Sequence, residues 1–491
     1  MRKPTVLVLV LALILSLAWA PANAEQTPKY VFLFIGDGQG IPQITATQYY
    51  LGTTENPEAA MPIPAQLSFT QFESLGMVTT YDATSFCPDS SSTASSIASG
   101  RKTLSGVLNY DVSLTEPFKL ITEYAKDSGM KVGVVTSVSL DHATPAAFYA
   151  KARSRNEYYN IAVQGVTGTT LDFLGGGAFL QPDGAEGKDE NVYALAEKNG
   201  FTVADTTEEI HALTGEESRA LVSVPDTDNS AAMQYEIDRI RKVAAGEESL
   251  PLSDIVRAAI KVLDNDKGFF LMTEGGKVDW ASHANDAMTG IRETMAFSEA
   301  VEVAKEFAAE HPDETLILIT GDHETGGLTI GFATTKYDTH FDYLTGQTIS
   351  FLDFDKVIGN LRETGGTFDA ALSEIEKYYG LTTAPDLPLS LNADELAKIQ
   401  AAYALSMLPK DQRVIGGAEK LAYGGYEPLS MAVSHILNNK AGVAYTSYSH
   451  TGLQVPVYAS GAGAFDFSGT YDNTGIFVRM MKVLGLQEDA G

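Results

Sequence analysis

Carboxylate, hydroxyl and imidazole side chains recur in this sequence directly after, or close to, short apolar runs. Six positions stand out, and they are Asp37; Ser90; Thr144; Glu274 with Asp279 and His283; Asp322 with His323; and His450. Oxygen and imidazole ligands in this mixture suit divalent cations, and Ser90 is the plausible nucleophile among them. The set therefore predicts a hydrolytic reaction assisted by bound metal ions, with a phosphate ester as the substrate.

Two pairs of these residues have a spacing that could hold one ion. Asp279 and His283 are four residues apart, which places both on one face of a helix, although surface charges of a helix would explain that spacing alone. Asp322 and His323 are adjacent, so both can reach one ion only in a turn, and the glycines at 321, 326 and 327 indicate a turn. Asp37 lies between two glycines directly after the apolar run 30–35, so it too is expected in a turn that follows a strand.

Ser90 stands in the Ser-rich stretch 89–99, which ends before Gly100. If a helix begins near Ser90, its hydroxyl lies at the positive end of the helix dipole beside free backbone N–H groups. That position suits a nucleophile that attacks phosphate and then holds it. An ordinary N-cap serine in a Ser-rich turn is the alternative, and only the neighbouring ligands favour the nucleophile.

The elements that must position these residues alternate between strands and helices. Apolar runs predict buried strands at 30–35, 131–136, 268–273, 315–320 and 454–459, and helical patterns occur at 117–128, 252–264 and 284–309. Alternation of this kind predicts an α/β fold, a three-layer sandwich with a mostly parallel central sheet. In such sheets ligands gather outside the carboxyl ends of the strands, which would bring the polar residues together.

Residues 332–440 interrupt that alternation with Tyr, Gly, Thr and acidic residues and one helical pattern at 393–408. We interpret them as a large, crown-like insertion before the last strand, which stands over the site or reaches toward a second subunit. A separate domain with its own activity is the alternative. The catalytic α/β domain would then comprise residues 25–331 and 441–491.

The first 24 residues have the layout of a secretory signal peptide. Arg2 and Lys3 precede the apolar stretch 6–20, and an Ala-x-Ala cleavage site follows at 22–24. A membrane anchor is the alternative, but the stretch is short for a bilayer span. No later segment is long and apolar enough to cross a membrane. We therefore expect an exported protein, in a periplasm or in the medium.

The bulk composition narrows the partners. The chain has 491 residues, 44% of them hydrophobic, and a formal net charge of −29, which disfavours nucleic acid and anionic membranes. The same charge repels a phosphate substrate unless bound cations supply a local positive field. Cys87 is the only cysteine, so the chain has no intramolecular disulfide. We expect Cys87 to be a buried, inert thiol, because no sulfatase motif follows it.

Taken in order, several motifs resemble those of the alkaline phosphatase family. They are Asp37 in Gly-Asp-Gly, Asp89-Ser90, Asp141-His142-Ala143-Thr144-Pro145 followed by Ser154-Arg155, Glu274 through His283, Gly321-Asp322-His323-Glu324, and His450-Thr451-Gly452. The resemblance runs from about residue 30 to the C-terminus and excludes most of 332–440.

The resemblance implies hydrolysis of small phosphate monoesters through a phosphoserine on Ser90, and a homodimer. It also implies two Zn²⁺ and one Mg²⁺ per chain, with these ligands: Asp279, His283 and His450 for the first zinc; Asp37, Asp322 and His323 for the second; and Asp37, Thr144 and Glu274 for magnesium. Ser90 would join the second zinc on deprotonation. Arg155 would bind two phosphate oxygens through its planar guanidinium.

Two positions near the substrate depart from the best-known bacterial pattern of that family. His142 stands where that pattern has Asp, and Trp280 stands where it has Lys. An imidazole could favour zinc over magnesium at the third site, and loss of the Lys charge should weaken product binding. The alternatives are a hydrogen-bonded core histidine and a packing tryptophan. The remaining histidines, His211, His311, His340 and His435, are assigned to the surface or to the insertion.

Two other functions remain open at this stage. A phosphodiesterase or sulfatase of the same fold is one, and Arg155 argues against it, because two free oxygens are typical of a monoester. A secreted protein that binds phosphate or metal without turnover is the other, and the intact nucleophile with its ligands argues against that.

Overall fold

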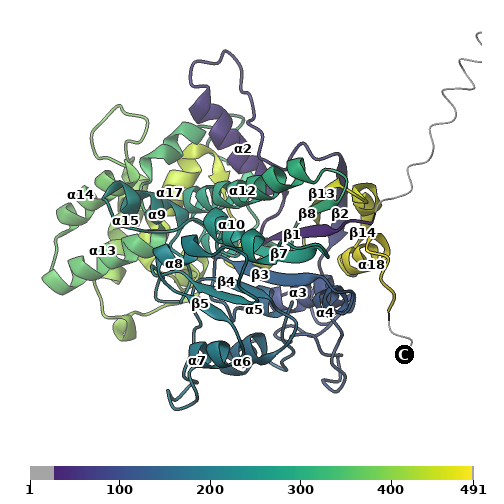
Figure 1. Cartoon of the computed structure of the whole chain (residues 1–491). Coiled ribbons are helices and arrows are strands. Elements are labelled where there is room, and N and C mark those ends of the chain that lie inside the picture. Colours follow the sequence, from purple (N-terminus) through teal and green to yellow (C-terminus); the bar gives the residue numbers. More distant parts are fainter. Residues whose placement is uncertain (1–26, 489–491) are drawn as a thin grey trace, which may run out of the picture.

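The computed structural model describes residues 27–488. A ten-stranded sheet crosses the molecule in the order β14-β2-β13-β8-β1-β7-β3-β4-β6-β5 (Figure 1). Its strands in chain order are β1 (Tyr30–Gly36), β2 (Ser74–Thr79), β3 (Lys131–Thr136), β4 (Phe173–Gly176), β5 (Thr202–Ala204), β6 (Ala220–Ser223), β7 (Phe269–Gly275), β8 (Thr315–Gly321), β13 (Val455–Gly461) and β14 (Gly469–Asp472).

The sheet is mostly parallel, as predicted. Only β13 is reversed, because it pairs antiparallel with both β8 and β2, and every other pair in the sheet is parallel. All five predicted apolar runs form strands of this sheet. The expectation of a single strand after the insertion is corrected, since β14 follows β13 and lies at the edge of the sheet.

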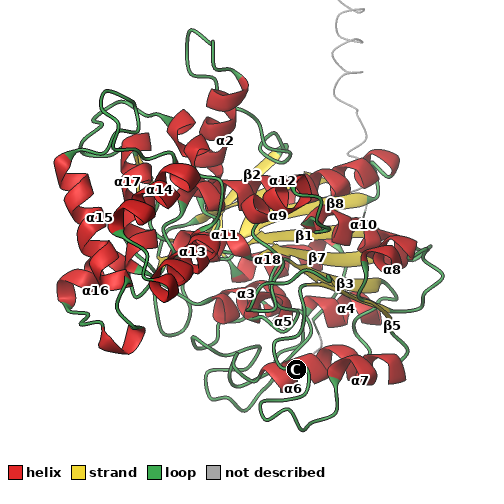
Figure 2. Ribbon diagram, turned by 90° about the vertical axis from the view of Figure 1, so that its left-hand side faces the viewer, coloured by secondary structure: helices red, strands yellow, loops and turns green. Residues whose placement is uncertain are grey.

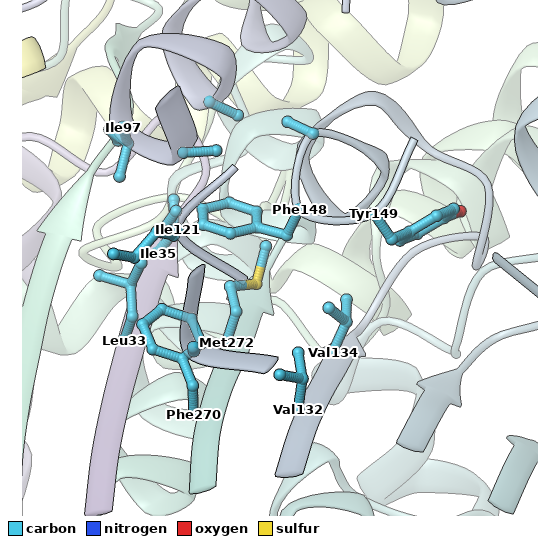
Figure 3. Close-up of a cluster of buried hydrophobic side chains, with 14 of the residues drawn as sticks. Leu33, Ile35, Ile97, Ile121, Val132, Val134, Phe148, Tyr149, Phe270 and Met272 are labelled. Carbon is cyan, nitrogen blue, oxygen red and sulfur yellow. The ribbon is translucent and has the colours of Figure 1, made fainter. Parts of the chain in front are cut away.

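Side chains of the central strands alternate between two buried cores. In β1, Val31, Leu33 and Ile35 join one core, while Phe32 and Phe34 join the core on the opposite face. A strand with both faces covered has no polar side, which explains its continuous apolar run. Figure 3 shows part of the first core, where residues of β1, β3 and β7 meet the helix residues Ile97 and Ile121.

Helices cover both faces of the sheet, which makes the three layers (Figure 2). The first core is covered by α3 (Ser90–Ser99), α4 (Ile121–Asp127), α5 (Ala143–Ala146), α6 (Tyr158–Thr167), α7 (Val192–Lys198) and α18 (Thr474–Val483). The second core is covered by α2 (Ile41–Glu55), α8 (Thr207–Ala212), α10 (Leu252–Leu263) and α12 (Ala287–Glu310), and α9 (Glu236–Ala244) packs on α12.

The 332–440 region is mostly helical, and Figure 2 shows its helices grouped at one end of the sheet. Its elements are η1 (Phe341–Gly346), α13 (Phe351–Thr364), α14 (Phe368–Tyr379), α15 (Ala393–Ser406), η2 (Lys410–Gln412), α16 (Gly417–Tyr423) and α17 (Pro428–Ala441). A short ladder of β10 (Thr329–Ile330) with β11 (Val443–Ala444) closes its base, so the chain enters and leaves at one place. Its core also includes residues of α2, α11 (Lys277–His283) and α12, and so the region packs directly on these helices beside the sheet.

The predicted signal peptide at 1–24 lies outside the described residues. Within residues 27–488, none of the helices combines the length and the apolar composition that a bilayer crossing requires. The division into a catalytic domain and an insertion stays a prediction.

A buried ion pair anchors the start of α11. The Lys277 side chain is fully buried, and its Nζ lies 2.8 Å from Asp228 Oδ2 and 2.5 Å from the Met233 carbonyl oxygen. The same nitrogen lies 3.7 Å from the centre of the Tyr235 ring. Lys277 thus fastens α11 to the 228–235 segment through one charge.

We predict that Lys277→Met destabilises the protein by about 3–5 kcal/mol, because it leaves the buried Asp228 carboxylate without its partner. Urea unfolding followed by circular dichroism measures the change. Lys188→Met is the matched control, since the Lys188–Glu186 pair is 77% exposed on both sides and should change stability little. Equal unfolding midpoints for the two variants would contradict the assignment.

Candidate active site and metal centre

The carboxyl ends of three neighbouring strands lie at one level of the sheet. Gly36 at the end of β1 pairs with Gly275 at the end of β7 and with Gly321 at the end of β8. The chain segments that leave these strands therefore start side by side, although they are far apart in sequence. Asp37 follows β1 directly, and Asp322 follows β8 directly.

Seven of the eight predicted metal ligands, together with His142, form three groups, in each of which the ligand atoms lie within 4.8 Å of one another. The groups are Asp279, His283 and His450; Asp37, Asp322 and His323; and Asp37, His142 and Glu274. Thr144 adjoins the third group, where its hydroxyl donates to Asp37 Oδ2 at 3.3 Å. The structure thus brings all eight predicted ligands to one place, while their roles toward a metal stay predictions.

Two histidines are oriented by backbone carbonyl groups. His283 Nδ1 lies 2.6 Å from the Tyr448 carbonyl oxygen, and His450 Nδ1 lies 2.5 Å from the Pro88 carbonyl oxygen. A carbonyl accepts only, so each Nδ1 carries a proton, and this hydrogen bond fixes the orientation of each ring and of its Nε2. The two Nε2 atoms are 3.0 Å apart and face a common point.

Residues of the 332–440 region support the segment that orients His283. The Tyr448 hydroxyl donates to the Ala422 carbonyl of α16 at 2.6 Å, while its backbone carbonyl accepts from His283. Asn285 donates to the Ser447 carbonyl at 2.8 Å and faces His435 Nε2 of α17 at 3.1 Å. His435, which lies in the 332–440 region, therefore contacts the segment that orients His283.

Burial and mutual repulsion disturb the titration of the acids. Burial, and then the charge of Asp322, raises the pKa of Asp37 well above its usual range. Burial raises the pKa of Glu274 to about 8 and, with the charge of Asp279, the pKa of Asp322 to about 7. Without a compensating cation these three acids take up protons more readily than free carboxyl groups do. Carboxylates that are buried close together behave in this way, because burial and repulsion both disfavour the charged form.

Asp279 and His283 carry opposite charges and lie 3.3 Å apart, from Asp279 Oδ2 to His283 Nε2. Burial opposes ionisation of both, but the charge and hydrogen bond of His283, together with the nearby His450 and His323, lower the pKa of Asp279 below its usual value. The Asp279 carboxylate in turn raises the pKa of His283 to about 9 against the effect of burial. The proton on His283 thus supplies, between two potential ligands, the positive charge that a bound cation would otherwise supply.

Divalent cations fit these residues. Within the described part of the chain, Asp37 Oδ1, Glu274 Oε1 and His142 Nδ1 are buried without a hydrogen-bond partner, and all three belong to the third group. Buried polar atoms left unpaired cost free energy that a shared ion would recover. The first two groups mix imidazole nitrogen with carboxylate oxygen, which is the donor set of zinc.

Ser90 begins α3 and is buried beside the second group. Its Oγ lies 3.2 Å from His323 Nε2, and Asp89 caps the helix by accepting from the Ser92 N–H at 3.1 Å. The Gly100 residue in the left-handed region, at φ 72°, ends the helix. The hydroxyl therefore lies where the helix dipole and the nearby ligands both favour an anion.

Arg155 and Trp280 lie on the same side of the site as His142. Arg155 Nη1 lies 3.0 Å from Asp89 Oδ2, and its Nη2 lies 3.2 Å from His142 Nε2. Burial and the Arg155 charge lower the pKa of His142 to about 3, so the imidazole is neutral. Trp280 is half-buried and meets the His142 ring edge to face at 5.8 Å, which brings both variable positions into contact.

Three threonines that sequence reasoning missed hold the acids in place. Thr136 donates to Glu274 Oε2, Thr325 donates to Asp279 Oδ1 at 2.5 Å, and Thr93 donates to Asp322 Oδ2 at 3.0 Å. Thr136 ends β3, so the same rule that found the ligands at strand ends could have found it. The other two carry no local signal.

The prediction that Cys87 is buried is wrong, because the residue is exposed. It lies in the turn before Ser90, where its N–H donates to Ser85 Oγ at 2.9 Å, and its neighbour Phe86 is 82% exposed. The turn carries both residues onto the surface.

The parallel sheet, the three ligand groups and the serine at a helix start define a metal-dependent hydrolytic enzyme. The sequence profile of alkaline phosphatases matches residues 28–486, nearly the whole chain. The chain belongs to the alkaline phosphatase family and is a phosphatase enzyme.

Individual relatives agree with this assignment. Alkaline phosphatase 3 of Bacillus subtilis (strain 168) is 28% identical over 469 residues, which cover 93% of this chain and 89% of that protein. The solved cold-active alkaline phosphatase from the psychrophile Shewanella sp. is 26% identical with a TM-score of 0.74, covering 93% and 99% of the two chains. A histidine-to-aspartate variant of the alkaline phosphatase from the Antarctic bacterium TAB5, with Mg bound in its M3 site, shares the fold at 24% identity and a TM-score of 0.62, covering 94% and 99%.

We predict that chelation lowers the melting temperature by about 5–10 °C, because it removes the charge that compensates the buried acids. Differential scanning calorimetry before and after EDTA treatment, and after zinc is returned, measures the shift.

Asp322→Asn is the matched control for charge. The amide keeps the size but relieves repulsion, so the metal-free variant should melt higher than the metal-free parent and respond less to zinc. An EDTA-treated parent that melts at the same temperature as the zinc-loaded protein would contradict the metal centre.

Proposed function

We propose that this phosphatase hydrolyses phosphate monoesters with Ser90 as the nucleophile, through a phosphoserine intermediate. The observation that carries the proposal is the position of the Ser90 hydroxyl, at the start of α3 and 3.2 Å from His323 Nε2 of the second ligand group. In this position one oxygen adjoins both the helix dipole and the predicted metal ligands.

The donor sets indicate the metals. Asp279, His283 and His450 would hold one zinc, and Asp37, Asp322 and His323 a second, because each set joins nitrogen to carboxylate oxygen. Asp37, Thr144 and Glu274 offer hard oxygens that suit magnesium, while His142 adds a nitrogen to the same group. When bound, such ions neutralise developing charge and lower the pKa of a hydroxyl group.

The chain's own residues direct the reaction. Arg155, held by Asp89 and His142, presents its guanidinium beside Ser90 and orients the phosphoryl group through paired N–H donors. The Ser90 Oγ–phosphorus bond forms as the bond to the ester oxygen breaks, and the alcohol leaves. Water then attacks phosphorus, which releases inorganic phosphate and restores Ser90. The dipole of α3 favours the phosphoryl group on Ser90 throughout.

Several wider properties belong to the same proposal. Residues 1–24 would act as a signal peptide, and the mature enzyme would be exported to a periplasm or to the medium. Small phosphate monoesters would be its substrates, with no nucleic-acid-binding surface. The homodimer remains a prediction, as does a crown role for the 332–440 insertion.

We predict that Ser90→Ala lowers kcat for p-nitrophenyl phosphate by more than about a thousandfold, because the attacking oxygen is removed. Ser96→Ala is the matched control, since Ser96 is equally buried in the same helix and donates only to the Ser92 carbonyl. Steady-state kinetics with equal metal content measures both variants. Turnover by Ser90→Ala at the parent rate would show that another group attacks phosphorus.

We also predict a strong preference for monoesters, because the Arg155 fork matches two free phosphate oxygens. The parent should have a higher kcat/KM for p-nitrophenyl phosphate than for bis(p-nitrophenyl) phosphate. Arg155→Lys should lower the ratio of these two kcat/KM values by about tenfold, because the paired donors are lost. Comparison of kcat/KM for the two substrates in both proteins measures the effect. A faster diester reaction would favour the phosphodiesterase alternative.

A further inference from the structure

Glu324 follows the ligand pair Asp322–His323, yet its carboxylate belongs to none of the three ligand groups. The side chain is fully buried. Its recorded donors are four neutral groups, namely the Gln43 side-chain amide, the Gly327 and Leu328 N–H groups and the Thr451 hydroxyl. A carboxylate that accepts from four neutral donors is satisfied without a cation.

These donors come from three different parts of the site. Gln43 lies in the first turn of α2, six residues after Asp37, and its Nε2 is 2.8 Å from Glu324 Oε1. The N–H groups of Gly327 and Leu328, at 3.1 Å and 3.2 Å, belong to the turn after the ligand pair. Thr451 is the neighbour of His450 and donates to Oε2. One carboxylate thus joins segments that carry ligands of both zinc groups.

The backbone makes the same connection. The strand β9 (Glu324–Thr325) pairs antiparallel with β12 (His450–Thr451), so that Thr451 lies opposite Glu324 and His450 lies opposite Thr325. This ladder is only two residues long, which is too short to be stable alone. The Thr451–Glu324 contact adds a charge-assisted hydrogen bond across it.

The packing around Glu324 leaves little room for adjustment. A Cβ built on Gly40 would lie 2.7 Å from Glu324 Cγ, so the glycine permits the close approach of the two segments. Gln43 also accepts from the Gly40 N–H at 3.0 Å and donates to the Thr325 carbonyl at 2.9 Å. Thr325 in turn contacts Asp279 and His323, which belong to different ligand groups.

We propose that Glu324 is a positioning residue that sets the separation between the Asp322–His323 pair and His450, and therefore between the two zinc sites. This inference rests on the proposed function. Glu324 acts through its neighbours, and an amide in its place would turn an N–H group toward a donor that needs an acceptor. His450 would then lose its fixed position relative to His323.

The test compares Glu324→Gln with the parent in zinc affinity, measured by chelator competition, and in kinetics. We expect the affinity for the weaker-bound zinc to fall at least tenfold, as for other residues that orient metal ligands. At saturating zinc, kcat should fall at least tenfold while KM changes less than twofold, because Arg155 and the phosphate contacts remain.

Two further variants separate positioning from general stability. Glu427→Gln is the matched control, because Glu427 is also buried but pairs with Arg362 and Arg413 inside the insertion. It should leave zinc affinity unchanged even where it lowers the melting temperature. Thr451→Val removes a single donor to Glu324, so it should weaken zinc binding by a smaller factor than Glu324→Gln does. If Glu324→Gln fails to fold, Thr451→Val takes its place in the test.

The outcomes distinguish the inference from the function it rests on. A parent that binds no zinc would overturn both. A parent that binds two zinc ions, with Glu324→Gln and Thr451→Val unchanged in affinity and kcat, would overturn the role of Glu324 alone. Equal loss of zinc affinity in Glu427→Gln would also overturn it, since the effect would then follow stability.

Discussion

The mutual repulsion of buried carboxylates is the constraint on which the rest of this structure depends. Asp37, Glu274, Asp279 and Asp322 are all buried at one edge of the sheet, where water screens their charges poorly. His283 compensates Asp279 with an opposite charge, and each raises or lowers the pKa of the other accordingly. Such a cluster persists in a fold when cations compensate it, and it then concentrates positive field at a place where an anionic substrate can bind.

The parallel sheet explains how residues far apart in sequence come to form this cluster. Since β1, β7 and β8 end at the same level, three segments deliver acids to one point without any long loop. Thr136, Thr325 and Thr93 then hold Glu274, Asp279 and Asp322 in place by donating neutral hydrogen bonds, which do not cancel the charge of the acids. The insertion adds a second layer of support, because α16 and α17 contact Tyr448 and Asn285 behind His283.

Much of this could be predicted from the sequence, and the reasons are local. A strand buried on both faces has an apolar run that nothing else interrupts, so β1, β3, β7, β8 and β13 were recognisable, and their polar neighbours followed. The strands β4, β5 and β6 have only three or four residues, which is too short for a pattern. At the other edge, β2 and β14 expose part of their residues to solvent and include glycine, so they resemble loops.

The supporting residues were beyond local reasoning for a different physical cause. Glu324 contacts Gln43 and Thr451, which lie 281 and 127 residues away, and its role depends on how those side chains meet in space. Cys87 was misjudged because cysteine is usually buried, whereas here a turn exposes it. The resemblance of motifs indicated which residues meet, but the geometry alone indicates what holds them.

Anomalous diffraction at the zinc absorption edge, from crystals grown with zinc, tests the central claim most directly. The account predicts two strong peaks per chain, one among Asp279, His283 and His450 and the other among Asp37, Asp322 and His323, with Ser90 beside the second. Crystals of the active enzyme with no peak at either place would contradict it.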